Sequence, residues 1–166
     1  MTPAEAAAAA ELVYREALYL DTRRWDDWLA LWDERAVFWV PAWKSETEPT
    51  AEPESEISLI YITSRAQLAE RVQRARSGLS AAAAAPLRTA HALSNLIVEP
   101  DPGGGAVCVR SVAATHVFDP ARTRQHSYFA RCEHRLVGTD GALRIACKKI
   151  VVLNDYLPAA MDFYTV

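Results

Sequence analysis

The sequence predicts an α+β domain in which helices cover one face of a curved, mostly antiparallel sheet. Two observations carry this prediction: the first third of the chain has helical periodicity, and the last part alternates as β-strands do. Turn-forming residues separate the strand-like runs at hairpin length, which favours an antiparallel meander. The length of 166 residues suits one domain over residues 1–166, and we find no internal repeat.

Two helices are predicted at the start of the chain. Thr2 can cap the first helix, Pro3 suits its first position, and Glu5 completes a capping box. Its apolar side chains fall on one stripe, made of Ala6, Ala9, Ala10, Val13, Ala17 and Leu20. The second helix has the spacing i, i+3, i+4 and i+7 at Trp25, Trp28, Leu29 and Trp32.

The middle of the chain is predicted to hold a short strand, a loop and a third helix. Residues 36–40 are an apolar run stopped by Pro41, and residues 42–56 form an acidic loop without periodicity. Ser64 and Gln67 form another capping box. The helix that follows has its inward positions at Leu68, Val72, Ala75 and Leu79, with Gly78 near its end.

Four long strands are predicted in the second half of the chain, after an alanine-rich connection at residues 80–85. Each strand ends at proline, glycine, asparagine or aspartate residues, which form turns. The strands span residues 91–99, 106–118, 125–137 and 143–153.

Composition excludes several classes of function. A net charge of −3 gives no electrostatic reason to expect nucleic acid or an anionic membrane as a partner. Three cysteines do not form a disulfide framework, and no apolar run has the length of a membrane span. The acidic start lacks the features of a secretory signal, so we expect a cytoplasmic protein with reduced thiols.

A pattern close to a Rieske iron–sulfur motif lies in the last two strands. Cys132 and His134 form the first ligand pair, and Cys147 follows thirteen positions later. A Rieske site needs a second histidine where Ile150 stands, and a hydrocarbon side chain cannot bind iron. The three ligands that remain could meet at a mononuclear metal site, but cysteines and a histidine in the core are the favoured interpretation.

His91 and Asn95 share one face of the strand predicted over residues 91–99, and they could activate water or bind a carbonyl group. A hydrogen-bonded polar pair that joins the strand to a helix is the favoured alternative. His116 and Asp119 lack the third ligand of a facial triad. We therefore predict no catalytic, cofactor-binding or metal-binding residue in this chain.

Several stretches together resemble the small (β) subunits of aromatic-ring-hydroxylating dioxygenases, most closely the benzoate, toluate and anthranilate group. They read YREA, WDDWL, FWVPAW and SEISLIY in the first part, and LAERV, RTAH with SN, and KKIVVLNDY later. The first of these stretches starts at residue 14 and the last at residue 148, and the others start at residues 25, 38, 55, 68, 88 and 94. The similarity therefore spans nearly the whole chain.

The resemblance implies a cone-shaped fold of the nuclear-transport-factor-2-like (cystatin-like) type. It also implies an α3β3 hexamer whose large subunit carries the Rieske [2Fe-2S] cluster and the mononuclear Fe(II). Electrons would come from NADH through a separate reductase, and an aromatic carboxylate would be dihydroxylated. The small subunit would assemble and stabilise the trimer of large subunits.

Candidate subunit contacts are aromatic or acidic residues near the loop and the carboxyl end, namely Trp43, Tyr61, Asp162, Phe163 and Tyr164. The acidic loop would dock against basic residues of the large subunit. The alternatives are a stand-alone dehydratase or isomerase on the same fold, and a small-molecule-binding module that uses the cone as its pocket. The enzyme would need a carboxylate partner for His91, His126 or His134, and the sequence offers no obvious buried one.

Overall fold

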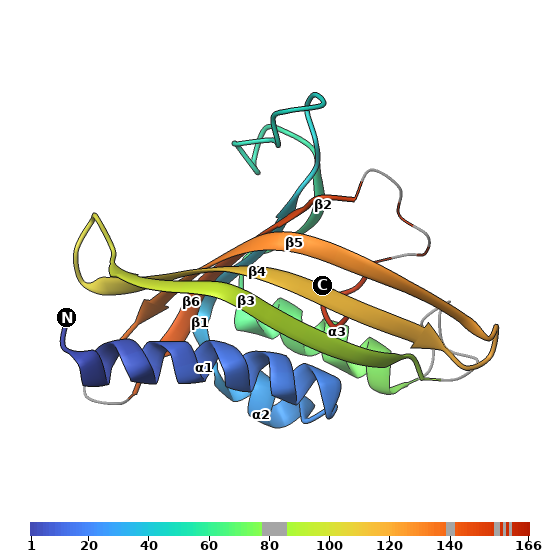
Figure 1. The fold of residues 1–166 in the computed structure, drawn as a ribbon, viewed down its shortest axis with the longest axis horizontal. Coiled ribbons are helices and arrows are strands. Elements are labelled where there is room, and N and C mark those ends of the chain that lie inside the picture. Colours follow the sequence, from blue (N-terminus) through green and yellow to red (C-terminus); the bar gives the residue numbers. More distant parts are fainter. Residues whose placement is uncertain (78–85, 139–141, 155–156, 158, 160) are drawn as a thin grey trace.

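The protein is an α+β structure in which three helices lie along one face of a six-stranded sheet (Figure 1). The computed structural model describes residues 1–77, 86–138, 142–154, 157, 159 and 161–166. The helices are α1 (Pro3–Asp21), α2 (Trp25–Ala30) and α3 (Arg65–Arg76). The strands are β1 (Trp32–Pro41), β2 (Ser58–Ile62), β3 (Arg88–Pro100), β4 (Ala106–Asp119), β5 (Arg124–Val137) and β6 (Arg144–Val152).

The sheet has the order β2-β1-β6-β5-β4-β3. Strands β3 to β6 pair antiparallel with their neighbours in the chain, which confirms the predicted meander. Strand β1 pairs parallel with β6, so an early strand lies beside the last one. Strand β2, which the sequence analysis did not predict, pairs antiparallel with the outer edge of β1.

The helix ends follow the capping chemistry expected from the sequence. The Thr2 hydroxyl accepts a hydrogen bond from the Glu5 amide, and the Glu5 carboxylate accepts one from the Thr2 amide. At the start of α3, the Ser64 hydroxyl accepts a bond from the Gln67 amide. Helix α3 ends at Arg76, so the inward position expected at Leu79 and the predicted connection at residues 80–85 lie outside the described residues.

The second helix is shorter than its apolar spacing predicts. It ends at Ala30, and Trp32 begins β1 instead of completing a further turn. The reason is pairing with β6: the Ile145 amide donates to the Leu31 carbonyl at 2.8 Å, and Trp32 lies opposite Ile145. Trp32 is still fully buried, with its ring centroid 5.3 Å from that of Trp28, so the core contact is kept in a different backbone conformation.

The core lies between the helices and the inner face of the sheet. Alternation along β5 sets this face, with Cys132 and His134 buried and Arg131, Glu133 and Arg135 exposed. The inward face of β5 that the sequence predicts is therefore confirmed. An aromatic cluster fills one end of the core, made of Trp25, Trp28, Trp32, Phe38 and Phe163.

Candidate functional site

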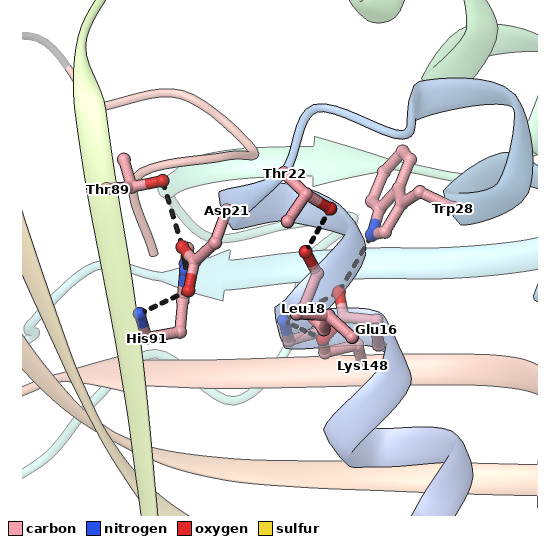
Figure 2. A network of polar contacts seen from close by, with 8 residues as sticks. All are labelled: Glu16, Leu18, Asp21, Thr22, Trp28, Thr89, His91 and Lys148. Atoms are coloured by element: carbon pink, nitrogen blue, oxygen red, sulfur yellow. Dashed lines mark hydrogen bonds and ion pairs between the residues drawn. The ribbon is translucent and has the colours of Figure 1, made fainter.

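An ion pair lies inside the cone, between α1 and the inner face of β6. The Lys148 ammonium donates to both carboxylate oxygens of Glu16, at 2.9 Å and 2.8 Å. The Glu16 side chain is only 2% exposed and the Lys148 side chain 5%, so the pair is screened from solvent. The Trp28 indole N–H also donates to Glu16 Oε1, at 3.0 Å, and Figure 2 shows the carboxylate held between these two donors.

His134 completes this buried polar cluster. It lies directly opposite Lys148 in the β5–β6 register, and its Nε2 is 3.7 Å from Glu16 Oε2. Neither ring nitrogen of His134 has a hydrogen-bond partner among the described residues. Burial lowers the pKa of His134, and the nearby Glu16 carboxylate opposes this shift without reversing it. The Lys148 charge lowers the pKa further, so the imidazole is neutral at pH 7.

The electrostatics of the cluster keep Glu16 ionised. Burial by itself would raise the pKa of Glu16, but the charge of Lys148 and its hydrogen bonds hold this pKa well below its ordinary value. A carboxylate that is tied to an ammonium and an indole N–H is a weak base, because removing it from these partners costs energy. The cluster therefore links α1 to β6 through bonds made by buried side chains.

Glu16 is a buried carboxylate beside His134, so the expectation that the histidines have no buried carboxylate near them is wrong. The signal was present: Glu16 falls on the buried stripe of α1, three residues after Val13 and four before Leu20. Lys148 was missed as well, although it shares inward strand parity with Ile150. A single charge at a buried position is unfavourable. The two charges are compatible with burial because they pair, and they come from segments far apart in the chain.

The residues of the Rieske-like pattern do not fit an iron–sulfur cluster. Cys132 lies opposite Ile150, which is fully buried in the core and has no ligating atom. Cys147 lies opposite Arg135, whose side chain is exposed, so Cys147 belongs to the other face of the sheet from Cys132 and His134. Burial also raises the pKa of the Cys132 thiol to about 11, which disfavours the thiolate that a cluster requires.

A mononuclear metal site from the same residues is equally poorly arranged. Within the described ranges, no group of three histidine, cysteine, aspartate or glutamate side chains is close enough to hold a metal ion. Cys132 and His134 are buried in the core, as the favoured sequence interpretation expects, whereas Cys147 is only partly buried on the other face.

His91 joins β3 to the end of α1 and does not form a site with Asn95. Asp21 accepts hydrogen bonds from the His91 amide at 2.8 Å and from the Thr89 hydroxyl at 2.9 Å (Figure 2). His91 Nδ1 lies 2.5 Å from Asp21 Oδ1, and these contacts lower the pKa of Asp21 against the effect of its partial burial. Asn95 is exposed and lies in a break of the β3–β4 register, so the structural alternative for His91 is confirmed.

The five predicted contact residues lie in two places. Trp43 is half-buried in the loop after β1, and its indole N–H donates to the Val152 carbonyl at 2.7 Å. Tyr61 lies in the edge strand β2 and is half-buried. The other three form the carboxyl-terminal tail, where Asp162 lies 3.9 Å from Arg71 of α3.

Phe163 differs from the other predicted contacts because its side chain has no exposed surface. Its ring centroid lies 5.4 Å from that of Trp25 and 4.9 Å from that of Trp28. It therefore fills the core of this chain, and its side chain is not available to a partner. Trp43, Tyr61, Asp162 and Tyr164 keep partial exposure, and their role as subunit contacts stays a prediction.

The loop over residues 42–56 joins β1 to β2 and extends beyond the edge of the sheet (Figure 1). Its base is ordered by Glu56, whose carboxylate accepts hydrogen bonds from the amides of Ala51 and Glu52 at 2.6 Å and 2.8 Å. Four glutamates of the loop are exposed, namely Glu46, Glu48, Glu52 and Glu54. None of the helices in the described part of the chain is long and apolar enough to cross a membrane.

Known proteins match both the sequence and the fold. Benzoate 1,2-dioxygenase subunit beta of Acinetobacter baylyi is 35% identical, over 93% of this chain and 89% of that protein. Toluate 1,2-dioxygenase subunit beta of Pseudomonas putida is 35% identical, over 96% of each chain.

Solved structures agree with these relatives. The beta subunit of benzoate 1,2-dioxygenase from Burkholderia mallei superposes with a TM-score of 0.76 at 31% identity, covering 95% of each chain. Naphthalene 1,2-dioxygenase has a chain that superposes at 0.78 with 16% identity, covering 99% of this chain and 86% of that one, which shows the fold alone. The predicted cone-shaped, nuclear-transport-factor-2-like fold is confirmed. Residues 15–159 match the family described as the ring hydroxylating beta subunit, and the chain therefore belongs to this family of small dioxygenase subunits.

Proposed function

We propose that this chain is the non-catalytic small subunit of a Rieske non-haem iron dioxygenase that dihydroxylates an aromatic carboxylate. Its relatives carry names that specify benzoate and toluate, and the similarity covers nearly the full length of each. In this proposal the large subunit carries the Rieske cluster and the mononuclear iron, and a separate reductase supplies electrons from NADH. A cytoplasmic location of the assembly is part of the same proposal.

The observation that carries the structural role is the closed set of interactions inside the cone. Both oxygens of Glu16, the most deeply buried carboxylate of the described residues, are bonded within the chain, so this carboxylate is not free to act on a substrate. Catalysis in such an assembly depends on the geometry of the large subunits, because electrons must cross between sites held at a fixed separation. A rigid small subunit that clamps neighbouring large subunits in an α3β3 hexamer would support turnover without touching the substrate.

Co-expression with a large subunit of a benzoate-type dioxygenase tests this proposal. We expect the chain alone to be colourless and inactive, and to purify in equimolar complex with the large subunit when both are present. Turnover of benzoate should require the large subunit and the reductase. Stoichiometric iron in the isolated chain, or unaided turnover of a cyclic ketone, would contradict the proposal.

A variant separates the structural role from an enzyme of the dehydratase or isomerase type. Glu16→Leu combined with Lys148→Met removes the buried charges as a pair and keeps the volume of the core. The assembly role predicts that the complex still forms and turns over benzoate. If the isolated wild-type chain had an activity that this folded double variant lost, the chain would be an enzyme in its own right.

A further inference from the structure

A hollow of about 360 Å³ lies on the face of the sheet that carries no helix. It spans strands β4, β5 and β6 and reaches the register break in β3. Its lining contains three cations and one carboxylate, Glu133, which pairs with Arg110. The other residues that matter for its chemistry are Asn95, Val112, Arg131, Lys149 and Val151. A volume of this size is in the range that holds a small organic molecule.

Two of the three cations around the hollow have partners within the chain. Arg110 pairs with Glu99 and with Glu133, the latter at 3.2 Å. The Lys149 ammonium lies 4.3 Å from the ring centroid of Trp39. Arg131 is exposed, and its guanidinium has no ion pair or hydrogen bond with any residue that the structure describes.

Arg131 lies between two apolar side chains. The register places Val112 of β4 opposite it on one side and Val151 of β6 opposite it on the other. Directly opposite residues share a face of the sheet and lie close enough for their side chains to touch. The Arg131 guanidinium, which has no partner among the described residues, therefore stands between two apolar side chains against which the flat body of a ligand could rest.

Asn95 places a second polar group at the rim. Its φ of 52° lies in the left-handed region, which asparagine tolerates better than most residues, and the β3–β4 register shifts between Ser94 and Ile97. Such bulges reorient a side chain relative to its strand. The result is an amide group beside the hollow that can donate a hydrogen bond to an anionic oxygen.

We propose that this hollow binds a small aromatic carboxylate, with the carboxylate on Arg131 and Asn95 and the ring over Val112 and Val151. Planar guanidinium and carboxylate groups pair through two parallel hydrogen bonds, which suits this arrangement. The inference rests on the proposed function only in the choice of benzoate as the ligand to be tested. Because the hollow is open, we expect weak binding, with a Kd of about 1 mM.

The test is a benzoate titration of the full chain, followed by NMR of its valine methyl groups. We expect saturable shifts at Val112 and Val151. Arg131→Gln should weaken binding at least about 10-fold, and Arg131→Lys should give an intermediate Kd because it keeps the charge without the fork geometry. Arg135→Gln is the matched control: Arg135 is exposed on the same face of the same strand and outside the hollow, so the Kd should stay at the wild-type value.

Further arms separate this site from general attraction of anions. Asn95→Gly keeps access to the left-handed backbone while removing the amide, and it should raise the Kd a few-fold in a chain that is still folded. Acetate and benzamide should each bind more weakly than benzoate, since each keeps only half of the ligand's chemistry. Equal Kd values for acetate and benzoate, or benzoate binding unaffected by Arg131→Gln, would overturn the proposal. The large subunit is absent from this titration, so its outcome is independent of the co-expression test.

Discussion

Glu16 and Lys148 form an ion pair that is buried away from solvent. Each charge offsets the cost of burying the other. Glu16→Gln would leave the Lys148 ammonium buried beside neutral partners. We expect it to lower the free energy of unfolding by about 3–5 kcal/mol, because an unpaired buried charge loses its hydration without compensation. Urea unfolding followed by tryptophan fluorescence measures this change.

The double variant and an exposed pair give the controls for that measurement. Glu16→Leu with Lys148→Met should be far more stable than either single change, since replacing a buried ion pair by apolar side chains is often neutral. Glu11→Gln, which breaks an exposed pair with Arg15, should have little effect. A single variant as stable as wild type would show that water reaches the pair.

His134 makes stability depend on pH in the range just below neutrality. Its folded-state pKa is lowered by burial, so the unfolded chain takes up a proton that the folded chain does not. Its contribution is therefore fully present above about pH 6.5 and decreases as the pH falls. His134→Phe should make the urea midpoint of unfolding depend less steeply on pH between pH 7 and pH 5. Burial also lowers the pKa of His126, so His126 accounts for part of the pH dependence that remains.

Glu16 acts in a separate and more acidic range. Its folded-state pKa is lowered, so its contribution is present above about pH 4.5 and is lost as the pH falls further. The loss below pH 4.5 should remain in His134→Phe. Identical slopes for wild type and His134→Phe between pH 7 and pH 5 would contradict the neutral, buried state of this histidine.

At the scale of elements, the end of α1 is fixed to β3 by one carboxylate. Asp21→Ala would leave the His91 amide and the Thr89 hydroxyl without their acceptor, so we expect a loss of about 1–3 kcal/mol. Hydrogen exchange should speed up at the His91 amide. Asp27→Ala, which removes an exposed contact to Arg24, is the matched control and should leave exchange in β3 unchanged.

The elements differ in how far the sequence could define them. Caps, stripes and turn residues are local signals, so α1, α3 and the β3–β6 meander were predictable. The end of α2 and the strand β2 depend on pairing with distant segments: Trp32 with Ile145, and Trp39 with Tyr61. Apolar spacing alone cannot distinguish a helix end from a strand start when both bury the same side chain.

At the scale of the whole molecule, the acidic loop is the predicted docking surface for the large subunit. Glu48→Gln with Glu54→Gln should slow association several-fold at low salt, because exposed charges at an interface act mainly on the association rate. Stopped-flow or surface-binding kinetics at two salt concentrations measure this. Glu11→Gln with Glu70→Gln removes the same charge from exposed helical positions and should leave the rate unchanged.

The buried cluster was harder to predict than the family. Long stretches such as WDDWL carry the resemblance because their order along the chain is distinctive. The role of Glu16 depends instead on Lys148, which lies 132 positions later in the chain. Only the packing of α1 against β6 brings these two residues together.

The parallel pairing of β1 with β6 has a consequence for how the protein is made. Strand β1 can complete its ladder only after β6, which ends at Val152, has left the ribosome. Until then, β1 can pair only with β2, and its other edge has no neighbouring strand. A fold with contacts this distant in sequence is expected to form slowly. The period before β6 docks is therefore when the chain is most exposed to aggregation.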